Sequence, residues 1–403
     1  MKPLSFLCIA TYFKGQEFMR ACKELGNTVY LLTDQKLSGE AWPHEAIDEV
    51  FYLPSPSNAT ENLDRMLAGL AHAMRSRTID RVVALDDFDV EKAALVRETF
   101  RIPGMGQTTA RFFRDKLAMR MRASSEGIRV PAFSALFHDE TITQFLRSTE
   151  APWLIKPRSE ASTTGIRKVY SLDEAWDVIH SLGDRRHEYL IEQFKPGRVY
   201  HVDSLSHDGT VIFTRASQYL ATPMEVAHGG GVFRTGNLAP DAPETADLYA
   251  LNRQVLSAFR MRHSASHSEY IRGDHDGELY FLETASRVGG AHIAEMVEAA
   301  SGVNLWREWA KLETAVARQE AYVLPDEQPQ YAGLIVSLAR QQWPDLSGFG
   351  EPEIWWRMNR EYHVGLIVRS DDPARVRQLL DDYLDRIRTD FHASAPVPDK
   401  STS

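Results

Sequence analysis

The segment 267–290 constrains this chain more than any other, because it combines a hairpin pattern with charged residues at fixed spacing. Residues 268–272 alternate apolar with polar side chains, a stretch of glycine and aspartate follows, and residues 279–282 are apolar. This pattern predicts two antiparallel strands joined by a turn. The prediction places Glu269 and Glu283 on adjacent strands.

The two glutamates of this hairpin predict a cation site. Two carboxylates on one side of a hairpin repel each other unless a cation lies between them, and Mg²⁺ takes one or two carboxylates together with phosphate oxygens. Arg287 follows Glu283 by four residues, and its planar guanidinium suits bidentate contact with a phosphoryl group. Gly289 and Gly290 then allow a close backbone approach before a helix expected near residue 291. A surface hairpin with ordinary charges is the alternative.

Length and charge narrow the class of protein. A chain of 403 residues can bury a large core in two or three lobes. The 56 acidic against 46 basic residues argue against a general nucleic-acid-binding surface. Cys8 and Cys22 are too few for a disulfide framework, and buried reduced thiols favour a cytoplasmic location. No segment has the length and apolarity of a membrane span, so we expect neither nucleic acid nor a membrane as a partner.

The first hundred residues predict a doubly wound α/β lobe. Residues 4–10, 15–25 and 28–33 read as strand, helix and strand, and a helix over 61–75 and a strand over 81–85 follow. No Gly-x-Gly-x-x-Gly follows the first strand and no Walker motif occurs, so neither nicotinamide nor P-loop nucleotide binding is predicted.

Two lysines come next. Lys116 lies in the first turn of a basic helix expected from residue 111 to 127, where a lysine is unfavourable to the helix dipole. A nearby anion or a solvated basic face would each account for it. Lys156 ends a short strand over 152–157, and the hydroxyl-rich loop 158–166 that follows can fold over phosphates with its backbone N–H groups.

Further strands are expected on the way to the hairpin. Residues 188–193 predict a strand that enters a Pro-Gly turn, and residues 199–203 and 211–214 predict a strand pair. The run Gly229-Gly230-Gly231 is either a mobile substrate loop or a plain flexible linker.

These motifs, taken in order over about residues 110–310, resemble the ATP-grasp superfamily, and most of all its carboxylate–amine ligases of the L-amino-acid (dipeptide) ligase branch. The set is Lys116, Lys156 with its Ser/Thr/Gly loop, Glu192-Gln193-Phe194 before Pro196-Gly197, and Glu269 with Glu283-x-x-x-Arg287. The resemblance implies an α/β and α+β protein, with an N-terminal doubly wound lobe, two α+β subdomains that clamp ATP, and a small C-terminal α+β lobe. The expected boundaries are 1–110, 111–190, 191–320 and 330–390, with a disordered tail over 391–403.

The resemblance also implies roles for individual residues. Lys116 and Lys156 would contact the phosphates of ATP, and the loop residues Ser162, Thr163, Thr164 and Gly165 would cover them. The adenine would be bound by Glu192, Gln193 and Phe194. Glu269 and Glu283 would hold Mg²⁺ or its substitute Mn²⁺, and Arg287 would contact the γ-phosphoryl group and the intermediate.

Two positions depart from the pattern of the superfamily. Ala285 stands two residues after Glu283, where many ATP-grasp enzymes carry asparagine, and the resemblance to the amino-acid ligase branch, which tolerates alanine there, accounts for it. Val199 stands where several relatives have a ribose-binding glutamate, and His201 and Asp203 lie on the same strand face, two and four residues on. His201 is therefore a candidate ribose ligand, with a packed strand histidine as the alternative. His263 and His267 are four residues apart but lack a third ligand of suitable spacing, so zinc is not expected.

The implied reaction is amide formation driven by ATP. A substrate carboxylate attacks the γ-phosphorus to give an acyl phosphate and ADP, and an amine then displaces phosphate from the acyl carbon. The expected partners are thus a small-molecule carboxylate, such as an amino acid, and an amine. The alternatives are a carboxylase-type enzyme that uses bicarbonate and a non-catalytic ATP-binding scaffold or sensor.

The C-terminal region predicts a small α+β lobe. Residues 331–338, 353–358 and 363–368 read as strands and residues 373–387 as an amphipathic helix. Two roles are open to this lobe, namely shaping the acceptor pocket and forming a homodimer interface. The tail from residue 391 is rich in Ala, Pro and Ser and is expected to be disordered.

Overall fold

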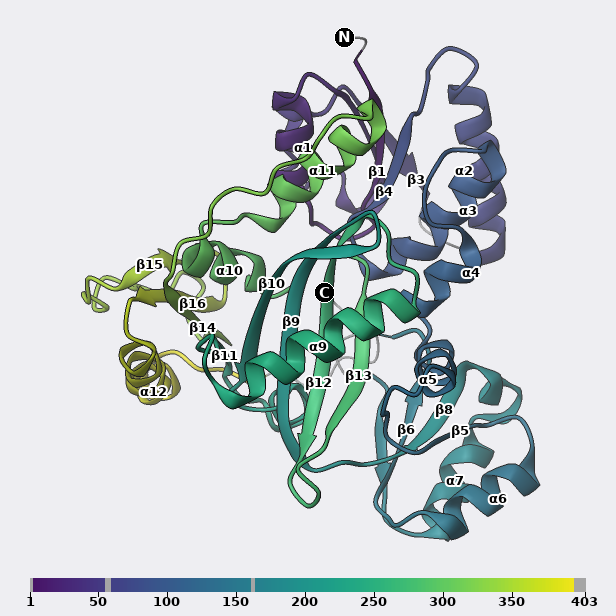
Figure 1. Cartoon of the computed structure of the whole chain (residues 1–403), viewed down its shortest axis with the longest axis vertical. Coiled ribbons are helices and arrows are strands. Elements are labelled where there is room, and N and C mark those ends of the chain that lie inside the picture. Colours follow the sequence, from purple (N-terminus) through teal and green to yellow (C-terminus); the bar gives the residue numbers. More distant parts are fainter. Residues whose placement is uncertain (1–2, 55–58, 161–163, 395–403) are drawn as a thin grey trace.

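The structure is a computed structural model of the chain, and it describes residues 3–54, 59–160 and 164–394 (Figure 1). These residues form three β-sheets, of four, eight and four strands. Figure 1 shows the N-terminal sheet at the top, the eight-stranded sheet in the middle and the second four-stranded sheet at the lower right. No helix in the described ranges has the length and apolarity needed to cross a membrane.

The N-terminal lobe is a parallel sheet of order β3-β2-β1-β4. The predicted strand–helix–strand opening is confirmed, and β1 lies between β2 and β4 as a doubly wound lobe requires. The sequence prediction missed β3, a short edge strand whose residues are half-buried or exposed. The elements are β1 (Ser5–Ile9), α1 (Gln16–Glu24), β2 (Thr28–Asp34), η1 (Gln35–Leu37), η2 (His44–Ala46), β3 (Glu49–Leu53), α2 (Ala59–Ala73), β4 (Arg81–Ala84), η3 (Asp87–Asp89) and α3 (Val90–Phe100).

A second, antiparallel sheet of order β5-β8-β6-β7 follows the helix α5 (Lys116–Ser125). The basic helix expected from residue 111 begins only at Lys116, because the Asp115 side chain accepts hydrogen bonds from the backbone N–H groups of Leu117 and Ala118 and caps the helix there. The other elements are α4 (Gln107–Ala110), η4 (Arg111–Phe113), β5 (Phe133–Ala135), α6 (Asp139–Ser148), β6 (Trp153–Pro157), β7 (Arg167–Val169), α7 (Leu172–Ser181), η5 (Gly183–Glu188) and β8 (Tyr189–Gln193).

The eight-stranded sheet is antiparallel and has the order β13-β12-β9-β10-β11-β14-β16-β15. The predicted hairpin is confirmed as β12 and β13 and forms one edge of this sheet (Figure 1). The strands are β9 (Gly197–His207), β10 (Thr210–Tyr219), β11 (Phe233–Asn237), β12 (Ser264–Gly273), β13 (Leu279–Ala285), β14 (Tyr331–Leu338), β15 (Ile354–Arg357) and β16 (His363–Ser370).

Helices cover both faces of this sheet and join it to the N-terminal lobe. In Figure 1, α9 (Pro243–Ala258) crosses in front of β9 and β12, whereas α11 (Leu305–Arg318) runs beside α1. The rings of Phe18 on α1 and Trp309 on α11 pack with centroids 5.1 Å apart, so the N-terminal lobe rests on the central sheet through an apolar contact. The helices that remain are α8 (Pro223–Gly229), α10 (Ile293–Ser301) and α12 (Pro373–Asp390).

Three expectations differ from the structure. The strands of the C-terminal region continue the eight-stranded sheet through the β11–β14 pair. The glycine run is no long loop, because α8 extends to Gly229 and Gly230 caps it with φ +63°. The tail was expected to be disordered from residue 391, but Phe391 is buried and His392 pairs with Ala339; residues 395–403 lie outside the described residues.

Candidate functional site

A cavity of about 440 Å³ lies where the second sheet faces the β12–β13 hairpin. Pockets for small ligands span about 300–1,000 Å³, so this cavity has the size of a cofactor site. Leu154, Val199, Ile271 and Leu282 give it apolar walls. The predicted site residues that line it are Lys116, Lys156, Thr164, Glu192, Gln193, Phe194, Glu269 and Glu283.

The two hairpin carboxylates meet in this cavity. Glu269 and Glu283 are directly opposite each other on β12 and β13, so their side chains project from the same face. Lys116 Nζ lies 2.9 Å from Glu283 Oε2. Burial raises the pKa of Glu283, but the charges of Lys116 and Lys156 outweigh it and lower the pKa overall, so this carboxylate is ionised at neutral pH.

Lys156 is held by a buried charge network that the sequence did not reveal. Glu192 pairs through Oε1 with Lys156 and through Oε2 with Arg120, whose Nε lies 3.0 Å away. Burial lowers the pKa of Lys156 to about 8, although the negative charge of Glu192 raises it in part. Burial raises the pKa of Glu192, yet Arg120 and Lys156 lower it further than burial raises it. Arg120 lies one helical turn after Lys116 on α5, and that spacing is the signal that could have found it.

The buried network gives Glu192 a second role besides the expected contact with adenine. Its carboxylate is already engaged by two cations, so it supports Lys156 directly. Beside it, Phe194 lies under Lys168, whose Nζ is 3.5 Å from the ring centroid. The contacts of Glu192, Gln193 and Phe194 with adenine stay a prediction.

The start of the loop after β6 is tied to α5. The backbone N–H of Lys116 donates to the Arg158 carbonyl at 2.8 Å, and Lys116 Nζ donates to the Glu160 carbonyl at 2.7 Å. Gly165 has φ +72°, and a Cβ atom there would lie 2.9 Å from Pro157 Cγ, so this position requires glycine. Thr164 is buried beside the cavity, whereas Ser162 and Thr163 lie outside the described residues.

Arg287 is not among the described residues that line the cavity, although its charge interacts with that of Glu283. Its Nη2 pairs with Asp87 at the start of η3, and its Nη1 donates to the Val288 carbonyl at 2.8 Å. Burial raises the pKa of Asp87, but Arg287 outweighs burial and lowers it. The structure therefore holds the predicted phosphate ligand against the N-terminal lobe, and its contact with a phosphoryl group stays a prediction.

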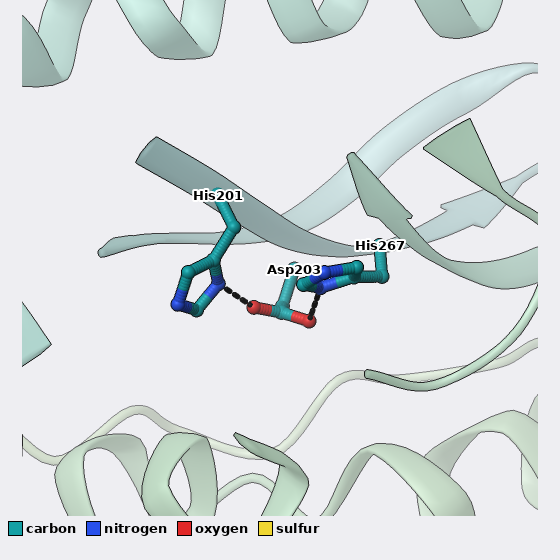
Figure 2. Close-up of side chains that lie close together, drawn as sticks. All are labelled: His201, Asp203 and His267. Atoms are coloured by element: carbon teal, nitrogen blue, oxygen red, sulfur yellow. Dashed lines mark hydrogen bonds and ion pairs between the residues drawn. The ribbon is translucent and has the colours of Figure 1, made fainter. Parts of the chain in front are cut away.

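His201 is the candidate ribose ligand, with a packed strand histidine as the alternative. The side chain is fully buried, with Nδ1 2.7 Å from Asp203 Oδ2 and Nε2 2.8 Å from Thr235 Oγ1 (Figure 2). Both ring nitrogens are occupied, which favours the packed strand histidine, and a contact of His201 with ribose stays a prediction. His267 Nδ1 lies 2.9 Å from Asp203 Oδ1.

A short segment after β10 also lines the cavity. Residues 222–225 line it where α8 begins. Thr222 and Glu225 form a capping box, in which each side chain accepts from the backbone N–H of the other. The spacing Thr-x-x-Glu before an apolar residue is the signal that could have found this helix start.

No family model matches the chain. An L-arginine-specific L-amino acid ligase of Bacillus subtilis is 28% identical over 234 residues, which are 56% of this chain and 56% of that relative, so the match spans about half of the relative's length. A solved L-amino acid ligase of Bacillus licheniformis superposes with a TM-score of 0.74 at 16% identity, over 97% of this chain and 98% of that one.

The chain has an ATP-grasp fold, like these solved structures. A carboxylase shares this fold. A biotin carboxylase of Campylobacter jejuni, solved as a complex with β,γ-ATP, has a TM-score of 0.70 at 15% identity, over 95% of this chain and 91% of that one. The fold thus agrees with the sequence prediction over nearly the whole chain.

Proposed function

We propose that this protein is an ATP-dependent carboxylate–amine ligase, which forms an amide or peptide bond through an acyl phosphate and releases ADP and phosphate. The observation that carries the proposal is the pairing of Glu269 and Glu283 across one hairpin, in the same cavity as Lys116 and Lys156. The similarity to amino acid ligases supports an amino acid or a related small carboxylate as one substrate.

The residues present fit a divalent cation with ATP. Glu269 and Glu283 offer hard carboxylate oxygens, which Mg²⁺ prefers, and Mn²⁺ accepts the same donors. Lys116 Nζ, at 2.9 Å from Glu283 Oε2, shows that this position attracts positive charge. A bound Mg²⁺ would neutralise the β- and γ-phosphates of ATP.

Positively charged side chains of the protein are available where negative charge would develop on the phosphoryl group. Lys116 and Lys156 reach the cavity from α5 and β6, and we assign both to the phosphates. Glu192 and Arg120 hold Lys156 in place, which fixes its ammonium group before the substrates arrive. We assign Arg287 to the γ-phosphoryl group, with Asp87 as its anchor in the N-terminal lobe.

Two steps give a balanced reaction. An oxygen of the substrate carboxylate bonds to the γ-phosphorus while the bond from that phosphorus to ADP breaks. The nitrogen of a neutral amine then bonds to the acyl carbon, and inorganic phosphate leaves with the acyl–oxygen electron pair. The amide nitrogen gives up a proton to solvent, and closing the site against water would protect the acyl phosphate from hydrolysis.

A matrix assay tests this proposal. Phosphate release is measured with ATP, Mg²⁺ and pairs of amino acids or small carboxylates, with mass spectrometry of each active mixture. ADP with a condensed product supports the ligase, whereas carboxylation of a substrate by bicarbonate would favour the carboxylase alternative. ATP binding without turnover of any pair would favour the scaffold or sensor. A cytoplasmic location and a homodimer stay expectations.

A further inference from the structure

A buried polar cluster lies beside one of the two hairpin carboxylates. His201, Asp203 and His267 come from neighbouring strands β9 and β12, and their polar atoms lie within 4.8 Å of one another (Figure 2). His201 and Asp203 are fully buried and His267 is 8% exposed. The ligase reaction as proposed uses none of these three side chains.

The distances in this cluster are those of hydrogen bonds. Asp203 lies 2.7 Å from His201 Nδ1 and 2.9 Å from His267 Nδ1. Two ligand atoms on a tetrahedral zinc ion lie about 3.3 Å apart, given zinc–nitrogen distances of about 2.0–2.1 Å. His201 Nε2 is also bonded to Thr235, so the cluster is a closed hydrogen-bond network.

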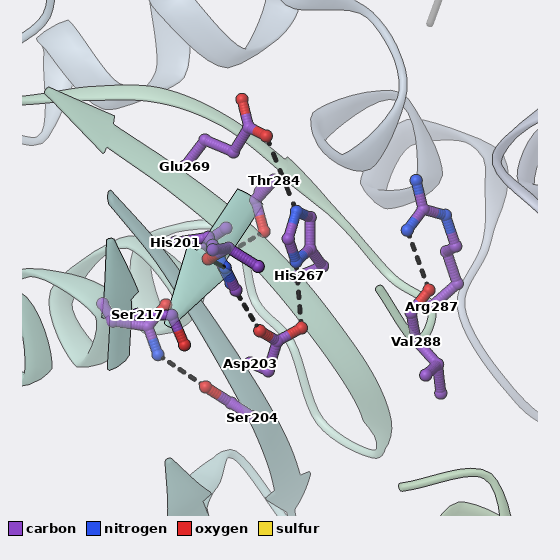
Figure 3. A network of polar contacts seen from close by, with 12 residues as sticks. His201, Asp203, Ser204, Ser217, His267, Glu269, Thr284, Arg287 and Val288 are labelled. Carbon is purple, nitrogen blue, oxygen red and sulfur yellow. Dashed lines mark hydrogen bonds and ion pairs between the residues drawn. The ribbon is translucent and has the colours of Figure 1, made fainter. Parts of the chain in front are cut away.

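The network ends on Glu269. His267 Nε2 lies 3.6 Å from Glu269 Oε1, and the Tyr219 hydroxyl donates to the same oxygen at 2.8 Å. The Tyr219 hydroxyl is also 3.4 Å from His267 Nε2. Figure 3 shows His267 between Asp203 and Glu269, in contact with both. Both side chains therefore contact Oε1, and Oε2 is the oxygen that we expect to meet a cation.

The packing around the network leaves it little freedom. The ring of His201 packs against Tyr219 with centroids 4.7 Å apart. A Cβ atom at Gly289 would lie 2.8 Å from Asp203 Oδ1 and 3.1 Å from His267 Nδ1, so the backbone after Arg287 closes directly over the pair. Side chains that contact a metal-binding residue in this way fix its orientation before the ion binds.

We propose that Tyr219 and His267, supported by Asp203 and His201, are positioning residues that set the carboxylate of Glu269 for the divalent cation. The inference rests on the proposed function, because it takes Glu269 as a metal ligand. Neither Tyr219 nor His267 needs to touch substrate or nucleotide in this role.

Metal affinity tests the proposal without turnover. Free Mn²⁺ is measured by electron paramagnetic resonance in the presence of the protein and a non-hydrolysable ATP analogue, and affinity for the metal-free analogue is measured in parallel. We expect Tyr219→Phe and His267→Gln each to weaken Mn²⁺ binding about 10-fold. Affinity for the metal-free analogue should stay unchanged, which a general loss of structure would not allow.

Two further variants make the outcome decisive. His263→Gln is the matched control, because His263 lies beside Asp208 outside the network, and it should bind Mn²⁺ like the parent. Glu269→Gln should bind it at least as weakly as the network variants. Normal Mn²⁺ affinity in both Tyr219→Phe and His267→Gln, with a loss in Glu269→Gln, overturns the positioning role alone. Normal affinity in Glu269→Gln overturns the metal site of the proposed function.

Discussion

Replacing Arg120 by methionine removes one partner from the buried network around Glu192. The Arg120 side chain is fully buried and contacts both Glu192 Oε2 and the Leu282 carbonyl. Breaking a buried ion pair from one side costs about 3–5 kcal/mol, which includes about 1–3 kcal/mol for an unsatisfied polar group. Lys156 still pairs with Glu192, so we expect a loss of about 3 kcal/mol in the free energy of unfolding, from a total of roughly 5–15 kcal/mol.

Urea unfolding followed by tryptophan fluorescence measures this loss. Arg185→Met is the control, because Arg185 pairs with Glu188 at the surface, and it should cause no measurable change. The double variant Arg120→Met/Glu192→Gln should recover part of the loss, since it leaves no carboxylate short of a partner. A loss below about 1 kcal/mol in Arg120→Met would refute the reasoning, because removing one partner of a buried ion pair should leave an uncompensated buried charge.

Three other predictions concern catalysis and ATP binding. Glu283→Gln should lower turnover at least about 100-fold while the melting temperature holds, since the variant keeps the shape but loses the charge; normal turnover in a phosphate-release assay would contradict the metal assignment. Burial lowers the pKa of Lys156 to about 8, so its positive charge is present below that pH and lost above it. Calorimetry should therefore show that the affinity of the parent for ATP falls as the pH rises through 8. The affinity of Lys156→Met should not change over the same range. Asp87→Asn should lower kcat about 10-fold with little change in the KM for ATP, because Arg287 loses its anchor; an unchanged kcat argues against this anchoring role.

The hairpin was predictable from the sequence because its information is local. Alternation over 268–272, a turn of glycine and aspartate and a second apolar run place Glu269 opposite Glu283 without reference to the rest of the chain. The start of α5 was also readable in principle, since Asp115 is a good N-cap.

Partners that are distant in sequence could not be predicted. Arg120 and Glu192 are 72 residues apart, and Arg287 and Asp87 are 200 apart. No periodicity links residues at such separations, because the contact depends on how the lobes pack. His201 is a second example of this limit. The sequence placed His201 and Asp203 on one face of the strand, but only the packing of β9 against β12 showed that both ring nitrogens of His201 are occupied.

The products of ATP turnover test the central claim most directly. With an active substrate pair, ³¹P nuclear magnetic resonance distinguishes ADP and phosphate from AMP and pyrophosphate, and added hydroxylamine traps an acyl phosphate as a hydroxamate. We predict ADP and phosphate in equal amounts, with a hydroxamate of the carboxylate substrate. AMP and pyrophosphate, or ADP without any acylated product, would contradict an acyl-phosphate ligase.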